Sequence, residues 1–232
     1  MSGNLNLDLL PPPAGSTLLD VGCAGGETTL GLQRAGYRMA AIESDPELVD
    51  ALRRKPGARD VDIRHGDATA MPFADQSFDG VVLIEVIEHV HDTGTLLAEI
   101  GRVVKPAGRL CVALPTAYTE HVYWRLNPEY ARNATHVTIF SLGQLRRHLD
   151  RAGFDIMAIE TKNLLPAVSW FFHALLRSRS DHTGTIFDHL WVDRFLTRVY
   201  ERMERTPFVS HVVTAVGGVF GKSWYVYCEK RA

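Results

Sequence analysis

The sequence predicts an α/β fold in which helices cover both faces of a doubly wound, mostly parallel sheet. Short β-branched runs alternate with segments of helical length from Leu18 to about Gly108. Turn residues separate the two kinds of segment, as in the stretches RAGY and RKPG. The chain has 232 residues, 46% of them apolar, and is therefore long enough to bury a sizeable core.

Turn and capping residues mark where the individual helices and strands begin and end. The stretch SDPEL begins a helix with a capping residue and a proline in the first turn, and KPAG is interpreted as a tight turn into the strand RLCVAL. Ser141 caps a further helix that ends at Gly153 and leads into the strand FDIMAIET. The elements expected before that helix are strands at 17–21, 38–43, 61–65, 79–84 and 108–113, and helices at about 26–35, 46–55 and 93–104.

The regular alternation stops near residue 161, and the final strand-like run SWYVYCEK comes only after about 60 further residues. So long a segment is uncommon as a plain loop, and we expect it to form a helical cap over 162–221, with helices near 165–177 and 188–205. The remaining residues, 1–161 plus 222–232, are expected to form one domain.

The cap sequence leaves several interpretations open. The apolar run at 164–176 fits core packing, a dimer contact or a lipid-like substrate. The arginines between 188 and 205 are interrupted by acidic residues, which is typical of a solvated face, although they also fit a phosphate-bearing acceptor or peripheral contact with a membrane surface. The apolar runs at 164–176 and 208–220 are both shorter than the ~20 residues that cross a bilayer. The oligomeric state is not predicted.

The charge balance and the cysteines bound the class of protein. Lysine and arginine number 25 against 27 acidic residues, so no global field would gather nucleic acid. The three cysteines are sparse and lack the paired spacing of a zinc site, which favours a reducing, cytoplasmic compartment. The N-terminal stretch does not resemble a signal peptide. We expect a small-molecule ligand and no nucleic-acid partner.

The stretch LLDVGCAGGETT carries the most chemical information. A strand, a glycine turn and a helix direct backbone N–H groups and the positive end of the helix toward a ligand. The dinucleotide fingerprint G-x-G-x-x-G holds a pyrophosphate, which a nearby carboxylate would repel. Here Asp20 lies two residues before Gly22, so the sequence favours a ligand with positive charge.

The same stretch resembles motif I of the class I S-adenosylmethionine-dependent methyltransferases, with Ala24 where that family usually has its middle glycine. The run GDATAMPFADQSFDGVVLIEVIEHV is similar to the small-molecule branch, which includes quinone-biosynthesis methyltransferases. The resemblance covers about residues 14–161 and the last strand. It implies a Rossmann-like sheet of seven strands with an antiparallel last strand, and S-adenosylmethionine as cofactor.

The resemblance and the spacing together assign a role to the acidic residue at or just after the end of each of the first three strands. Asp20 and the glycine turn would hold the methionine portion, Glu43 the ribose hydroxyls, and Asp67 the adenine amino group. Structural alternatives are a turn cap for Asp20, an exposed strand end for Glu43 and a turn former for Asp67. The complete cofactor-binding set is Asp20, Gly22, Cys23, Ala24, Gly25, Glu43, Ser44, Asp67, Ala68, Ile84 and Glu85.

The stretch EVIEHVHD follows the fourth strand. If it begins a helix, Glu85, Glu88 and His89 share a face that could bind a divalent metal. A similar run followed by a later histidine, here His136, is the metal site of small-RNA 2'-O-methyltransferases, whereas many metal-free relatives carry the same letters. We therefore assign no metal ligand, and the question stays open.

His136 is the candidate catalytic residue. It lies in a segment that resembles the H-hydrophobic-x-x-Phe-Ser run of the same branch, and a histidine titrates near neutral pH, so it fits a general base or an acceptor-orienting group. The alternative is a histidine that holds the loop through a hydrogen bond. The aromatic segment 115–130 offers acceptor contacts or ordinary loop packing through Tyr118, His121, Tyr123 and Trp124.

These observations predict a methyltransferase that uses S-adenosylmethionine and acts on a small or amphiphilic organic acceptor, more readily at oxygen than at nitrogen or carbon. The alternatives are a non-catalytic module that only binds S-adenosylmethionine, and a nicotinamide-dependent oxidoreductase. A nucleic-acid methyltransferase fits less well because the sequence lacks a sustained basic groove.

Overall fold

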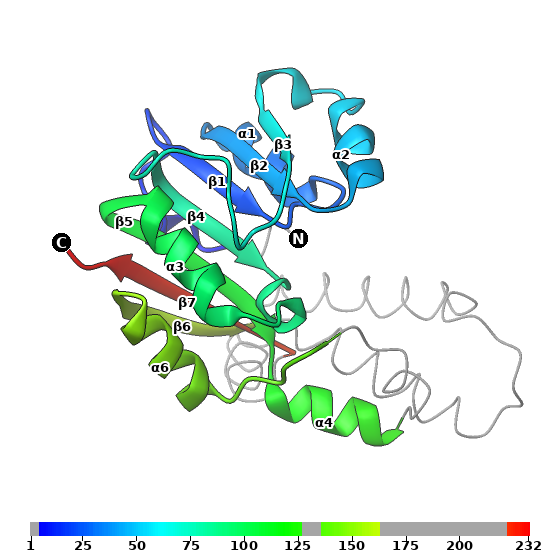
Figure 1. Cartoon of the computed structure of the whole chain (residues 1–232), viewed down its shortest axis with the longest axis vertical. Coiled ribbons are helices and arrows are strands. Elements are labelled where there is room, and N and C mark those ends of the chain that lie inside the picture. Colours follow the sequence, from blue (N-terminus) through cyan, green and yellow to red (C-terminus); the bar gives the residue numbers. More distant parts are fainter. Residues whose placement is uncertain (1–4, 127–135, 163–221) are drawn as a thin grey trace, which may run out of the picture. The chain divides into compact units, whose positions relative to one another are not determined.

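The computed structural model of the protein describes residues 5–126, 136–162 and 222–232 (Figure 1). The chain divides into two compact units. The first consists of residues 1–114, 140–159 and 225–232, and the second of residues 115–139 and 160–224. The expected cap lies outside the described residues except for Lys162, so the expected domain boundaries and cap helices stay predictions.

One seven-stranded sheet has the strand order β3-β2-β1-β4-β5-β7-β6. The pairs β1·β2, β2·β3, β1·β4 and β4·β5 are parallel, and β7 is antiparallel (Figure 1). The predicted doubly wound sheet with an antiparallel last strand is confirmed. The strands are β1 (Thr17–Val21), β2 (Arg38–Glu43), β3 (Asp62–His65), β4 (Phe78–Ile84), β5 (Val104–Pro115), β6 (Phe154–Lys162) and β7 (Ser223–Lys230).

The chain builds this sheet outward from β1 in both directions. It runs from β1 through β2 to β3 on one side, and then returns to place β4 on the other side of β1. The carboxyl ends of β1 and β4 therefore form the switch point at which open α/β sheets bind their ligands. The central strands are mainly apolar because helices cover both faces; Leu18, Leu19, Val81 and Val82 are fully buried.

Helix starts agree with the capping residues read from the sequence. Asp45 accepts a hydrogen bond from the Glu47 amide, with Pro46 in the first turn, and Ser141 forms a capping box with Gln144. The helices are α1 (Glu27–Arg34), α2 (Pro46–Arg53), α3 (Thr93–Val103), α4 (Ala117–Leu126) and α6 (Leu142–Arg151), with short 3-10 helices η2 (Leu7–Leu9), η3 (Ala58–Asp60) and η4 (Ile87–His89). Within the described ranges, no helix has both the length and the apolar character that a bilayer span requires.

One local expectation was wrong. The stretch KPAG is not a turn before the strand but lies inside β5, which begins at Val104. Phe78 pairs with Val104 and Gly80 with Arg109, so the extra residues bulge out of the ladder, and Ala107 adopts a positive φ of 59° there. In the aromatic segment 115–130, for which the sequence leaves acceptor contacts and loop packing both open, α4 occupies Ala117–Leu126.

Candidate functional site

The glycine turn connects β1 to α1. Gly22 has φ 69°, Ala24 has φ 44° and Gly26 has φ 80°, a region that glycine enters most readily. The amides of Gly22 and Cys23 both donate to the carbonyl of Ile42 in β2, at 2.9 and 3.2 Å, which holds the turn against the neighbouring strand. Burial raises the pKa of the Cys23 thiol to about 12, so this side chain is neutral at physiological pH.

Gly26 has both an unusual backbone conformation and a close neighbour. A Cβ at this position would lie 2.1 Å from Cδ1 of Leu52. We expect Gly26→Ala to lower the free energy of unfolding by about 2–4 kcal/mol, through backbone strain and overpacking together. Gly15→Ala is the matched control, because Gly15 has φ 87° but no atom within 4 Å of its Cβ position. Chemical denaturation measures both; equal losses for the two variants would contradict the packing argument.

Asp20 lies beneath the turn, near the end of β1, and is 2% exposed. The hydroxyl of Thr29 in α1 donates to its Oδ2 at 2.6 Å, so the carboxylate ties the strand to the helix that follows the turn. Burial raises the pKa of Asp20 from 3.8 to about 6; the hydrogen bonds from Thr29 oppose this rise, and the charge of Glu43 adds a smaller contribution to it. A desolvated carboxylate of this kind favours a positive charge nearby.

Asp20 makes the stability of the ligand-free protein depend on pH. Its folded-state pKa lies above the unfolded value, so the folded protein binds the proton more tightly, and the contribution of Asp20 to stability falls as the pH rises from about 4 to about 6. Asp20→Asn keeps an acceptor for Thr29 and removes the charge. We expect this variant to be more stable at pH 7, by at most ~3 kcal/mol, and equally stable near pH 4. Denaturant unfolding at both pH values measures this; a stability difference that shrinks with rising pH would contradict it.

Glu43 lies at the carboxyl end of β2 and links two turns. Its Oε2 accepts from the Ala24 amide at 2.9 Å, and its Oε1 accepts from the amides of Ser44 and Asp45 at 2.8 and 3.1 Å. The Ser44 hydroxyl adds a further hydrogen bond at 3.2 Å. The expected ribose-binding carboxylate is therefore held rigidly beside the glycine turn.

Asp67 follows β3 and is exposed at the same edge of the sheet. Its Oδ1 accepts from the amide of Thr69 at 2.8 Å, and its carbonyl accepts from Ala70 at 3.1 Å, so it also shapes its own turn. Ala68 is half-buried beside it. The turn-forming alternative and the ligand-binding role are compatible, because a carboxylate accepts several hydrogen bonds.

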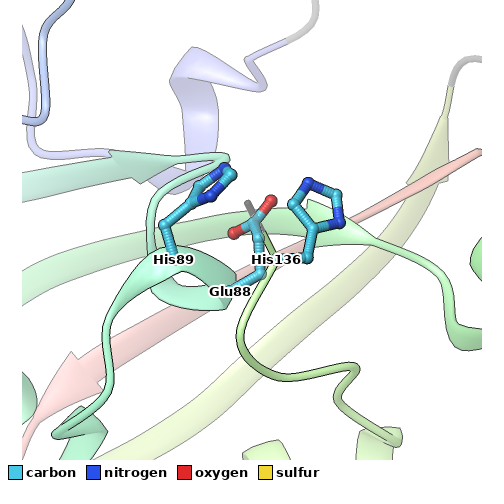
Figure 2. Close-up of side chains that lie close together, drawn as sticks. All are labelled: Glu88, His89 and His136. Atoms are coloured by element: carbon cyan, nitrogen blue, oxygen red, sulfur yellow. The ribbon is translucent and has the colours of Figure 1, made fainter. Parts of the chain in front are cut away.

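The end of β4 differs from the helix that was considered for EVIEHVHD. Ile84 ends the strand, and Glu85 has φ 53° and donates its amide to the carbonyl of Ala113 at 2.7 Å. Glu88 and His89 lie on the three-residue 3-10 helix η4, Glu88 buried and His89 exposed (Figure 2). The condition for a shared helical face of Glu85, Glu88 and His89 is not met, because Glu85 precedes the short helix η4.

His136 belongs to the second unit, where it pairs with an acid. Its Nδ1 lies 3.0 Å from Oε2 of Glu120, a residue of α4 that is only 2% exposed. A buried carboxylate on Nδ1 orients the ring and favours the proton on that nitrogen. This hydrogen bond is compatible with both interpretations of His136, as a residue that holds the loop and as a catalytic residue.

The expected acceptor contacts lie on α4. Tyr118 is 64% exposed, and Nδ1 of His121 is 2.5 Å from the carbonyl of Ala117, one turn earlier in the same helix. The side chains of Tyr123 and Trp124 lie outside the described residues. The role of these four residues in binding the acceptor stays a prediction.

Sequence reasoning missed the residues that hold these groups. Thr29 positions Asp20, Glu120 positions His136, and Nζ of Lys55 donates to the carbonyl of Gly25 at 2.6 Å, bracing the glycine turn. Thr29 stands in the helix directly after the motif, where a hydroxyl facing the strand acid is the one signal that could have identified it. Lys55 and Glu120 carry no such signal.

The donor set of the first unit fits S-adenosylmethionine better than a dinucleotide. Asp20, Glu43 and Asp67 lie at the carboxyl ends of three neighbouring parallel strands, around a turn with the backbone freedom to approach a ligand. Carboxylates suit an ammonium group, a sulfonium, a diol and an exocyclic amine. They would repel a pyrophosphate.

Comparisons with known proteins agree with this chemistry. Residues 19–112 match the family model described as a methyltransferase domain. The chain is 32% identical over 176 residues to O-methyltransferase cnsE of Penicillium expansum, covering 70% of this chain and 61% of that protein. It is 28% identical over 169 residues to 27-O-demethylrifamycin SV methyltransferase of Amycolatopsis mediterranei, covering 70% and 62%. The chain thus spans about three fifths of the length of these curated relatives.

The fold also matches solved structures. An S-adenosylmethionine-dependent methyltransferase from Mesorhizobium loti aligns with a TM-score of 0.64 at 12% identity, covering 96% of this chain and 94% of the other. This match shows the shared fold, whereas the family model and the sequence relatives carry the assignment. The methyltransferase-domain match over residues 19–112 and the sequence relatives together support a class I S-adenosylmethionine-dependent methyltransferase of the small-molecule type.

Proposed function

We propose that the protein transfers a methyl group from S-adenosylmethionine to a hydroxyl oxygen of a small organic acceptor. The observation that carries the cofactor part is the placement of Asp20, Glu43 and Asp67 at one edge of the sheet around the glycine turn. The observation that supports oxygen is the pairing of His136, which is half-buried, with the buried carboxylate of Glu120. The two O-methyltransferase relatives agree with an oxygen acceptor.

Each acid has a distinct task in this proposal. Asp20 acts on the positive charge of the methionine portion through its field, since it is buried and its Oδ2 is engaged by Thr29. Glu43 accepts hydrogen bonds from the ribose hydroxyls, with Ser44 beside it, and Asp67 accepts one from the adenine amino group, with Ala68 beside it. The turn from Gly22 to Gly25 lets the cofactor lie close to the backbone. Ile84 and Glu85 are proposed to border the cofactor.

His136 is the proposed general base. The proton on Nδ1 is donated to Glu120, so the lone pair lies on Nε2, which can accept the proton of an acceptor hydroxyl. The bound cofactor would supply an electrophilic methyl carbon. As the acceptor oxygen bonds to that carbon, the carbon–sulfur bond would break to release S-adenosylhomocysteine, and the hydroxyl proton would pass to Nε2 of His136. The protein then has to hold the acceptor in line and exclude water.

A methyl-transfer assay tests the proposal. The protein is incubated with S-adenosylmethionine labelled in its methyl group and a panel of phenols, aliphatic alcohols, amines and carbon acids, with and without magnesium. The proposal expects label in an O-methyl product. Transfer only to nitrogen or carbon would overturn the oxygen assignment, and cofactor binding without transfer to any acceptor would favour the non-catalytic module.

The preference for an amphiphilic or lipid-like acceptor rests on 164–176, which lies outside the described residues. It stays a prediction. Including a long-chain phenol beside its short-chain homologue in the panel tests it, because an apolar acceptor site favours the longer chain by ~0.8 kcal/mol for each buried methylene.

A further inference from the structure

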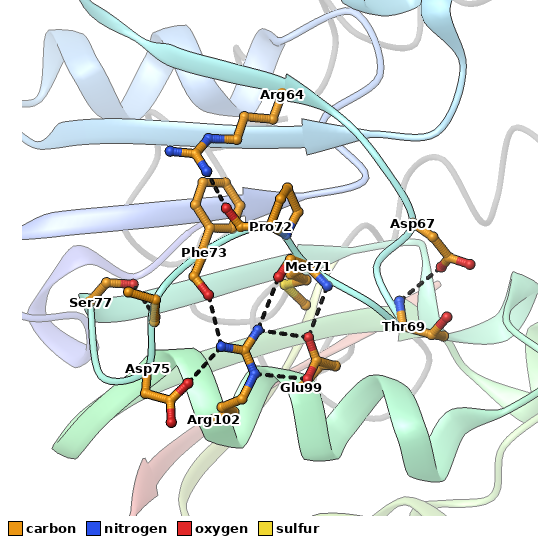
Figure 3. A network of polar contacts seen from close by, with 11 residues as sticks. Arg64, Asp67, Thr69, Met71, Pro72, Phe73, Asp75, Ser77, Glu99 and Arg102 are labelled. Atoms are coloured by element: carbon orange, nitrogen blue, oxygen red, sulfur yellow. Dashed lines mark hydrogen bonds and ion pairs between the residues drawn. The ribbon is translucent and has the colours of Figure 1, made fainter.

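The guanidinium group of Arg102 in α3 makes several contacts with the loop that follows β3, residues 66–77 (Figure 3). Arg102 donates from Nη1 to the carbonyl of Phe73 at 2.7 Å and from Nη2 to the carbonyl of Met71 at 3.0 Å. Both partners are backbone atoms. The side chain therefore fixes the path of the loop backbone, and does more than neutralise the charge of one neighbour.

Two carboxylates hold the guanidinium in that position. Glu99 accepts from Nε and Nη2 of Arg102, both at 2.8 Å, and Asp75 accepts from Nη1 at 2.7 Å. Glu99 also accepts from the amide of Met71 at 2.8 Å, so it contacts the loop directly. Such a planar, bidentate arrangement is specific to arginine, because a lysine offers one point charge.

Other contacts fix the start and the middle of the same loop. Gly66 donates its amide to the carbonyl of Glu43 at 3.0 Å, which ties the start of the loop to β2. The guanidinium of Arg64 lies 4.3 Å from the centre of the Phe73 ring, and Phe73 packs edge-on against Phe78. Residues 67–70 are therefore a short bridge between two anchored segments.

We propose that Arg102 is a positioning residue for recognition of adenine: by fixing the Met71–Asp75 segment it directs the carboxylate of Asp67 at the exocyclic amine. The inference rests on the proposed function, since the adenine belongs to the proposed cofactor. Arg102 itself need not touch that cofactor. A hydrogen-bonding site must be held to a fraction of an ångström, and Asp67 is exposed, so the precision has to come from the anchors of its loop.

The test compares two ligands that differ at one position of the base. S-adenosylhomocysteine carries the exocyclic amine, and S-inosylhomocysteine carries a carbonyl oxygen there, which cannot donate to Asp67. Isothermal titration gives the ratio of their dissociation constants. We expect the wild-type protein to prefer the adenine ligand by about tenfold or more, and Arg102→Met to reduce that preference to about twofold or less.

Arg231→Met is the matched control. Arg231 donates to the carboxylate and the carbonyl of Asp150 in the same unit and does not belong to the loop network, so its replacement should keep the wild-type ratio. A general loss of stability would weaken both ligands equally and leave the ratio unchanged. Glu99→Gln gives a second, milder perturbation of the same network, should Arg102→Met fail to fold.

The outcomes separate the two proposals. An undiminished ratio in folded Arg102→Met, or in Glu99→Gln if only that variant folds, would overturn the positioning role while leaving the cofactor assignment intact. Equal wild-type affinity for the two ligands would also overturn it, because Asp67 would then not discriminate the amine. Failure of the wild-type protein to bind either ligand would overturn the proposed function and the role of Arg102 with it.

Discussion

Replacing His136 with alanine is expected to lower the rate of methyl transfer to a hydroxyl acceptor by about 100-fold to 10,000-fold. The imidazole is the proposed proton acceptor, and its loss leaves water as the base. Binding of S-adenosylmethionine should stay unchanged, because the cofactor residues are assigned to the first unit. Initial rates at saturating cofactor, together with isothermal titration, measure the two effects separately.

Two further variants define the role of the pair. Glu120→Gln should also slow transfer, because its amide can donate to Nδ1 and favour the opposite tautomer of His136. His148→Gln is the control, since His148 lies on α6 of the first unit and packs against Phe140. Full activity in His136→Ala would restrict this histidine to holding its loop.

Replacing Glu43 with alanine is expected to weaken S-adenosylmethionine binding by about 100-fold or more. Hydrogen bonds to a charged group each contribute ~1.5–3 kcal/mol, and the proposed contact uses both ribose hydroxyls. The variant also removes the acceptor of the Ala24 amide, so the glycine turn loses one of its links to β2, while the hydrogen bonds from Gly22 and Cys23 to Ile42 remain. Isothermal titration of the folded variant measures the loss.

Glu47→Ala is the matched control for Glu43→Ala. It removes one exposed carboxylate from the first turn of α2, and the overall charge changes by the same amount. Its affinity should stay within about twofold of the wild-type value, as is usual for surface substitutions. If both variants bind the cofactor as tightly as the wild-type protein, the ribose assignment is wrong.

Much of the fold could be predicted because its signals are local. The bounds of β1 and β2 follow from continuous apolar runs, and the starts of α2 and α6 follow from Asp45, Pro46 and Ser141. The bulge in β5 could not be predicted, because KPAG has the composition of a turn and only pairing with β4 shows that the strand continues through it. The stretch EVIEHVHD is likewise compatible with a longer helix, but the structure has only the short helix η4 there.

The sequence places the proposed cofactor acids but not their supports. Asp20, Glu43 and Asp67 follow strands at regular intervals, and the topology brings those strand ends to one edge. Contacts made across the fold leave no local pattern: Arg102 meets the carbonyls of Met71 and Phe73 about 30 residues earlier in the chain. Motifs in the sequence therefore predict the residues that face the ligand. The residues that hold them in place are found only in the structure.

The most direct measurement is isothermal titration of the wild-type protein with S-adenosylmethionine and, separately, with NADH. The account predicts saturable binding of S-adenosylmethionine alone, because the buried carboxylate of Asp20 lies beneath the glycine turn, where it would repel a pyrophosphate. Binding of NADH alone, or of neither ligand, would contradict it.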